Sequence, residues 1–181
     1  DEVDEVVKRL EDIIRKHETL VKKAKEDLDR VNEEDTKLIR DVLRRLKESN
    51  EEMERLVRSG VSEDDARRLL DENRKLNEEA NRRNKKSLED NSRLNEKLNR
   101  DSKRVLDEIR ELLKDIERRS TDERVKEELR RVEEDVKKSD EDARRLSKED
   151  RDHTRENFKR SEELSRRDEE TSRRLMEEVK R

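Results

Sequence analysis

Apolar residues, interspersed with Asn, Ser, Asp and His, recur at alternating steps of four and three along three long stretches of the chain. The first series runs from Val3 to Val42, the second from Leu70 to Val105 and the third from Val125 to Asn157. This spacing keeps one face of a helix against its neighbours over many turns. A sustained heptad spacing predicts helices that coil around one another with a left-handed supercoil.

Two short segments interrupt the pattern and carry the residues of helix ends. Gly60 is suited to a left-handed C-terminal cap, and Ser62 with Asp65 has the spacing of an N-cap and its acidic N3 partner. Farther along, Thr121 or Asp122 can cap the start of a third helix. We therefore expect turns near 59–62 and 120–122.

The turns divide the chain into helices of about 58 residues each, at 2–58, 63–119 and 122–181. Helices joined by turns of a few residues are antiparallel to their neighbours. The predicted fold is all-α, an up-down-up antiparallel three-helix bundle that forms a single domain over residues 1–181. Additional apolar residues beside the first series favour a helix with two neighbours over a simple pair; they are Val6, Ile13, Leu20, Ile39, Leu43 and Leu46.

Polar residues occupy many positions on the face that should be buried. An unpaired buried polar group costs about 1–3 kcal/mol, so these side chains must bond to one another or meet water. We interpret them as a structural polar network, whose candidate members are His17, Asp35, Ser49, Asn73, Asn77, Asn84, Ser87, Asn91, Ser102, Ser139, Asp150, His153, Asn157, Ser161, Asp168 and Thr171.

Antiparallel pairing about the two turns predicts which of these residues face one another. The expected partners are Asp35 with Asn84 and Ser87, Asn84 with His153 and Asn157, Asn91 with Asp150, Asn73 with Asp168, and His17 near Ser102 and Ser139. The residues Asn81, Asn95 and Asn99 flank the seam, and the sequence leaves open whether they join the network, reach a partner or meet water.

The amino-acid composition argues against several classes of binding partner. Charged residues make up 59% of the 181 residues, yet 51 basic and 55 acidic residues nearly cancel, which is typical of solvated helix faces. The chain lacks the basic surface and the aromatic residues that bind nucleic acid or anionic lipid. No apolar run is long enough for a membrane span, and no signal peptide is expected at the acidic beginning of the chain.

The sequence offers little for catalysis. His17 and His153 are the only residues that titrate near neutral pH, and Asp150 lies three residues before His153. A metal or general-base pair would need further ligands on the seam, where Asn and Ser stand instead, so we expect neither an enzyme nor a cofactor or metal. A pH switch through a buried histidine stays open as a weaker alternative.

With its minimal SGVSEDD and RSTDE turns, charge-saturated surface and polar seam residues, the chain resembles de novo designed helical bundles with buried hydrogen-bond networks. The resemblance implies a scaffold without a natural biochemical function, in which the networks specify helix register and pairing. It implies no required partner, or else a second copy or a complementary designed helix, and no small-molecule substrate. A designed chain has no natural location, and we expect it to be soluble in the cytoplasm of a recombinant host.

Two other interpretations stay open. In the first, the three helices leave a groove for a further helix, which makes the chain a binding or assembly module. In the second, the chain is a natural three-helix rod of the spectrin type or one that lies on a membrane surface, although it has neither the buried Trp of the former nor the basic face of the latter.

Overall fold

The structure, a computed structural model, describes the backbone of residues 2–60 and 62–180 and the side chains of 4–60 and 62–179. It contains α1 (Glu2–Ser59), α2 (Glu63–Arg119) and α3 (Glu123–Lys180). Residue 61 of the first predicted turn, residue 181 of the third predicted helix and the side chain of Val3 lie outside the described part. The prediction of three long helices is confirmed.

The first turn follows from the chemistry of Gly60 and Ser62. Gly60 has a φ of 75°, a left-handed conformation that a residue without a Cβ adopts without strain. Ser62 Oγ accepts a hydrogen bond from the Asp65 amide at 3.3 Å and donates one to the Asp65 carboxylate at 2.8 Å. The Ala66 amide also donates to the Ser62 carbonyl. These bonds satisfy donors that the first turn of α2 would otherwise leave open.

The second turn is capped by Asp122. Its Oδ1 accepts a hydrogen bond from the Arg124 amide at 3.1 Å, and its carbonyl accepts one from the Lys126 amide at 3.1 Å. At the end of α2, the Ser120 amide donates to the Ile116 carbonyl at 3.0 Å. Of the two candidate caps at this turn, the structure therefore uses the aspartate.

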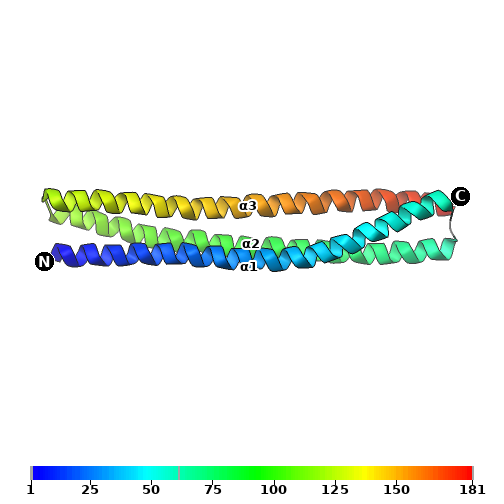
Figure 1. The fold of residues 1–181 in the computed structure, drawn as a ribbon, viewed down its shortest axis with the longest axis horizontal. Helices are drawn as coiled ribbons and strands as arrows, with labels where there is room; N and C mark the ends of the chain where they lie inside the picture. The colour runs from blue at the N-terminus through cyan, green and yellow to red at the C-terminus, as the bar shows by residue number, and fades with distance from the viewer. Residues whose placement is uncertain (1, 61, 181) are drawn as a thin grey trace. The chain divides into compact units, whose positions relative to one another are not determined.

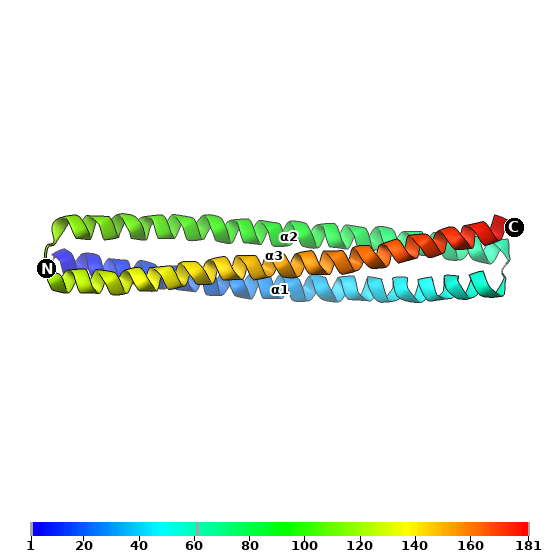
Figure 2. The same cartoon turned by 90° about the horizontal axis from the view of Figure 1, so that it is seen from above.

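The helices contribute to two compact units. Unit 1 comprises residues 1–30 and 91–151, and unit 2 comprises residues 31–90 and 152–181. Each unit includes a part of all three helices, which lie side by side within it (Figures 1 and 2). The expectation of one domain over the whole chain stays a prediction.

Unit 1 is held together by a cluster of aliphatic side chains from all three helices. Leu10 and Ile109 are the most completely buried members, at 0% and 1% exposed. The full set of buried members is Val7, Leu10, Ile13, Ile14, Val105, Leu106, Ile109, Leu113, Ile116, Leu129, Val132 and Val136. Because β-branched and Leu side chains dominate this set, burial of apolar surface stabilises unit 1.

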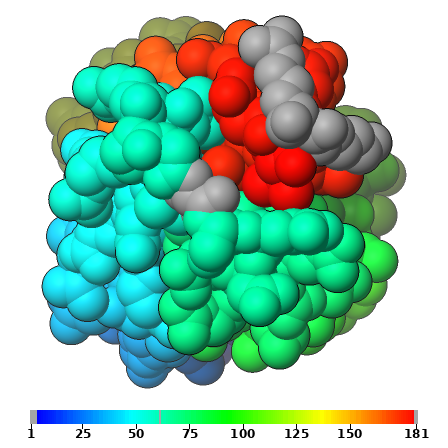
Figure 3. All heavy atoms as spheres, turned by 90° about the vertical axis from the view of Figure 1, so that its right-hand side faces the viewer, coloured from blue at the N-terminus to red at the C-terminus, as the bar shows by residue number. Residues whose placement is uncertain are grey.

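Unit 2 has a smaller apolar cluster near the α1–α2 turn. Met53, Ala66, Leu69 and Leu175 form its buried part. Figure 3 looks onto this end of unit 2, where the last turns of α1, the first turns of α2 and the last turns of α3 pack together. Since the cluster is small, polar side chains occupy much of the remaining interior of unit 2.

Contacts within unit 2 give the directions of its helices. Going up α2, Asn73, Asn77 and Asn84 bond to Asp168, Ser165 and Ser161, whose numbers fall along α3. Likewise, Arg45 pairs with Glu79 while Ser49 bonds to Asn73. Within this unit, α2 is therefore antiparallel to both α1 and α3. The left-handed supercoil stays a prediction.

Candidate functional site

The most connected polar cluster of unit 2 surrounds the Asp168 carboxylate. Asp168 is 0% exposed and accepts hydrogen bonds from Asn73 Nδ2 at 2.6 Å and from Asn50 Nδ2 at 3.3 Å, both at Oδ1. Asn77 Nδ2 donates to its Oδ2. One side chain of α3 is thus bound by amides from both α1 and α2.

The amides around Asp168 use their carbonyl oxygens as well. Asn77 Oδ1 accepts from the Ser165 hydroxyl at 3.2 Å, and Asn73 Oδ1 accepts from Asn77 Nδ2 at 3.3 Å. Asn73 Nδ2 also donates to Ser49 Oγ at 3.1 Å. The Thr171 hydroxyl donates to the Arg167 carbonyl at 3.0 Å and lies 3.5 Å from Asn50 Oδ1. We call this set, Ser49, Asn50, Asn73, Asn77, Ser165, Asp168 and Thr171, the Asp168 cluster.

Two opposing effects act on the protonation of Asp168. Burial raises the pKa of its carboxyl group, because the charged form loses hydration. The amide bonds from Asn73, Asn77 and Asn50 lower it, and burial is the larger effect. Among the described side chains the buried carboxylate has amide partners but no cationic partner, so it depends on these three amides for its solvation.

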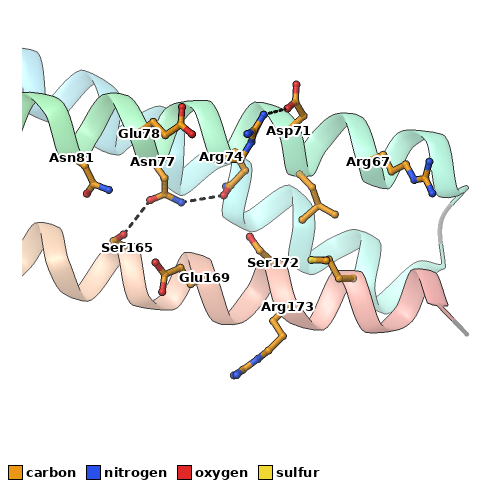
Figure 4. Close-up of a pocket in the computed structure, with 13 residues that line it drawn as sticks. Arg67, Asp71, Arg74, Asn77, Glu78, Asn81, Ser165, Glu169, Ser172 and Arg173 are labelled. Atoms are coloured by element: carbon orange, nitrogen blue, oxygen red, sulfur yellow. Dashed lines mark hydrogen bonds and ion pairs between the residues drawn. The ribbon is translucent and has the colours of Figure 1, made fainter.

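The Asp168 cluster reaches the surface at a groove between α2 and α3 (Figure 4). The groove has a volume of about 570 Å³, and Asn77 and Ser165 lie in its wall. Leu70 and Met176 form its apolar end. Within the cluster, the Asp168 side chain is therefore shielded from solvent, whereas the half-buried Asn77 is in contact with it.

Two further polar contacts lie elsewhere in unit 2. Asn84 Nδ2 donates to Ser161 Oγ. Asp35 is half-buried and hydrogen-bonded to Ser87; burial raises the pKa of Asp35, and the nearby Asp90 carboxylate raises it further. The expected Asp35–Ser87 and Asn73–Asp168 neighbours are thus hydrogen-bonded in the structure.

Unit 1 contains a polar layer centred on His17. The ring is 0% exposed, with Nδ1 2.5 Å from Ser139 Oγ and Nε2 2.8 Å from Ser102 Oγ. The imidazole of α1 therefore links hydroxyls of α2 and α3, the three residues that pairing about the turns predicted to be neighbours. Burial lowers the pKa of His17, and the charges of Asp140 and Glu18 raise it by less.

A second polar layer of unit 1 joins α2 to α3. Asn95 Nδ2 donates to the Ser147 carbonyl at 3.0 Å and to Asp150 Oδ2 at 3.3 Å, and the Ser147 hydroxyl donates to Asn95 Oδ1. Asn91 is also buried, at 3% exposed. Asn95 thus belongs to the interior, although the sequence left its place open.

His153 and Asn157 are exposed, which corrects the prediction that they join the buried network, although Asn157 lines the same small cavity as Asn84. Asn157 Nδ2 lies 3.2 Å from His153 Nε2 on the same helix, and Asn84 bonds to Ser161 instead. The physical reason is the phase of α3. Its inward stripe follows Ser147, Thr154, Ser161, Asp168 and Leu175 at seven-residue steps, so positions 153 and 157 rotate outward.

The sequence analysis missed Asn50, Ser147 and Ser165 and left the place of Asn95 open, and all four residues bond within the polar clusters. Each lies next to a predicted seam position or within one turn of it. Helices with two neighbours bury a wider stripe than a two-stranded seam does. Applying the same antiparallel pairing to flanking positions would have identified Asn95 with Ser147 and Asn77 with Ser165.

The described residues offer no group of three or more His, Cys, Asp and Glu side chains placed to hold a metal ion. Over the same part of the chain, no helix combines the length and apolar character needed to cross a membrane. The side chains brought together in the two units are mainly amides and hydroxyls, which both donate and accept hydrogen bonds.

No protein-family model matches the sequence. No curated protein is significantly similar to it. Among solved structures, the chain is similar to one described as "Computationally designed three helix bundle". The two share 16% sequence identity, the match covers 99% of this chain and 87% of the other, and the TM-score is 0.46.

Proposed function

We propose that the chain is a designed structural scaffold without a natural biochemical function, in which buried polar side chains specify how the helices pair and in which register. It requires no partner or cofactor and carries no catalytic site. The observation that carries this proposal is the Asp168 cluster, where one carboxylate of α3 accepts hydrogen bonds from Asn50 of α1 and from Asn73 and Asn77 of α2.

The cluster favours one arrangement because its donors and acceptors match only there. Rotating or sliding one helix would separate Asp168 from Asn50 or Asn73 and leave buried polar atoms without partners. Each buried polar group left without a hydrogen-bond partner lowers the folding stability by about 1–3 kcal/mol. A purely apolar seam imposes no such penalty, since Leu packs against Leu in several registers.

The surface fits the same interpretation. Ion pairs of helix residues three or four apart recur along all three helices, such as Arg67–Glu63, Arg74–Asp71 and Arg160–Glu156. Such pairs support each helix locally by a few tenths of a kcal/mol without choosing its neighbours. The choice among possible helix arrangements therefore depends mainly on the buried side chains.

An apolar variant tests the proposal. It carries Asn50→Leu, Asn73→Leu, Asn77→Leu and Asp168→Leu together. We expect it to remain helical and to unfold at a higher denaturant concentration, because apolar groups replace the buried carboxylate together with the three amides that donate to it. Native mass spectrometry should then show several assembly states where the parent chain shows one.

A matched control carries Leu69→Met and Leu175→Met in the neighbouring apolar cluster. These volume-conserving changes keep the polar cluster and should keep a single assembly state. If the apolar variant forms the same single species as the parent chain and this control, the cluster does not specify assembly and the proposal fails.

A further inference from the structure

A small cavity lies between the three helices of unit 2, away from the Asp168 cluster. Its volume is about 20 Å³, and its polar lining comes from all three helices. The lining residues are Asn32, Thr36, Ile39, Asn84, Ser87, Leu88, Thr154, Asn157 and Phe158. A cavity of about 10–15 Å³ accommodates one water molecule, so this one has room for one and not for a larger solute.

The Thr154 hydroxyl in the cavity wall needs a hydrogen-bond partner. Thr154 Oγ1 is buried and has no hydrogen-bond partner among the described residues. Thr154 belongs to the inward stripe of α3, one heptad before Ser161, so its side chain points into the unit. Buried hydroxyls are almost always hydrogen-bonded, either to protein or to an ordered water.

We infer that this cavity binds one ordered water molecule, held by the Thr154 hydroxyl and by amide or hydroxyl groups of the other two helices. A buried water usually makes about three hydrogen bonds, and the cavity wall offers amides and hydroxyls of α1, α2 and α3 in addition to Thr154. The bound water would add a hydrogen-bonded link from α3 to the other two helices. The inference does not depend on the proposed scaffold function.

The surroundings favour an uncharged occupant. The groups that line the cavity are neutral amides, hydroxyls and apolar side chains, and none is a carboxylate or an ammonium. Three of them, Ile39, Leu88 and Phe158, are apolar and would not solvate an ion. Water satisfies a hydroxyl and several amides in any combination, since it both donates and accepts.

The test is a high-resolution crystal structure of the full chain and of its Thr154→Val variant. We expect a water oxygen within about 3 Å of Thr154 Oγ1 and of one more polar atom of the wall. In the variant, which keeps the shape but removes the hydroxyl, this water should be lost or moved. The inference is overturned if the cavity is dry, or if the Thr154 hydroxyl turns to bond the Asp150 carbonyl of its own helix.

A solution measurement keeps the test independent of crystals. Water-to-methyl nuclear Overhauser effects distinguish a long-lived water from bulk hydration, and Ile39 and Leu88 supply methyl groups in the cavity wall. We expect effects of the long-lived sign at these methyls, and their loss in Thr154→Val. The exposed Thr19 provides the bulk reference, and Leu175, which is 0% exposed in the apolar cluster around Met53, provides the reference without nearby water. Signals at Ile39 and Leu88 that match either reference would contradict the inference.

Discussion

The buried titratable residues differ in how their partners respond to a proton. The hydroxyls of Ser102 and Ser139 can donate or accept, so His17 keeps two hydrogen bonds in either protonation state. The amide nitrogens around Asp168 can only donate, so they match the ionised carboxylate. Burial is therefore the main reason why the pKa of His17 is lowered. For Asp168, burial raises the pKa, whereas the amide donors lower it.

The stability of the protein should depend on His17 below neutral pH. Because burial lowers its pKa, the unfolded chain binds a proton at higher pH than the folded chain does. The contribution of His17 is complete above pH 6.5, the ordinary pKa of a histidine side chain, and is lost as the pH falls through the lowered pKa of the folded state. Urea unfolding at several pH values should show this loss in the parent chain and not in His17→Gln.

The exposed His153 supplies the control for this experiment. His153→Gln makes the same chemical change at an exposed position and should change the unfolding free energy by less than about 0.5 kcal/mol. An equal flattening of the pH dependence by both substitutions would show that burial of His17 is not its cause.

Asp168→Leu alone should destabilise the protein, in contrast to the fourfold apolar variant. It removes the acceptor of three amides, of which Asn50 and Asn73 are buried, at about 1–3 kcal/mol for each buried amide that finds no other partner. Equilibrium unfolding in guanidinium measures the change. Asp152→Leu, at an exposed position of α3, should change stability by less than about 0.5 kcal/mol. Similar losses for the two variants would contradict the role given to the cluster.

At the level of single residues, the sequence predicted partners well only where the heptad phase was right. Asn73 was expected opposite Asp168, and the two are hydrogen-bonded. His153 was placed inward because steps of three and four from Asp150 allow either 153 or 154. Periodicity alone cannot choose between adjacent positions, and packing of Ser161, Asp168 and Leu175 decided for Thr154.

The ends of the helices are set by capping residues that were predicted from the sequence. Gly60 has the left-handed conformation expected of a C-terminal cap, and Ser62 and Asp65 bond to each other at the start of α2. Thr121 and Asp122 were equally acceptable caps by residue type. The choice of Asp122 depends on backbone geometry, which residue type does not specify.

Replacing Gly60 should reveal conformational strain without steric conflict. Its φ is +75°, and a Cβ added there would meet no atom within 4 Å. Gly60→Ala should therefore cost about 1 kcal/mol through the left-handed backbone alone. Gly60→Asn should cost less, since Asn tolerates this conformation. Thermal unfolding of both variants measures the difference, and equal losses would assign the cost to something other than backbone conformation.

The three helices of unit 2 are unevenly packed along their length. Among the described residues, none in 31–41, 81–90 or 152–160 is fully buried, whereas 42–53, 66–80 and 161–175 contain most of the buried side chains of the unit. Segments with few buried contacts open at lower free energy. Within unit 2, the first set of segments should therefore be the more dynamic one.

Hydrogen exchange monitored by mass spectrometry or NMR tests this difference. Amides in 31–41, 81–90 and 152–160 should exchange at least about tenfold faster than those in 42–53, 66–80 and 161–175. Uniform protection over both sets would mean that half-buried polar packing holds the helices as firmly as the apolar cluster around Met53 does.

For the chain as a whole, the number of helices followed from its periodicity, and the short turns predicted the antiparallel order that the contacts within unit 2 show. The short turns, between Ser59 and Glu63 and between Arg119 and Glu123, restrict how far neighbouring helices can slide. They do not restrict rotation of a helix about its own axis to the same degree. The polar clusters are therefore needed mainly to fix which face of each helix points inward. The heptad pattern alone did not decide this, because it allowed either of two adjacent positions.

The most direct test of this account is the amide NMR spectrum of the apolar variant, with Leu at positions 50, 73, 77 and 168. If the Asp168 cluster selects one arrangement, the parent chain gives one sharp resonance for each amide. The variant then gives several or exchange-broadened resonances for unit 2 while keeping its helical content and a higher unfolding midpoint. A variant spectrum with a single sharp set of resonances would contradict the claim that buried polar side chains specify the packing of the helices.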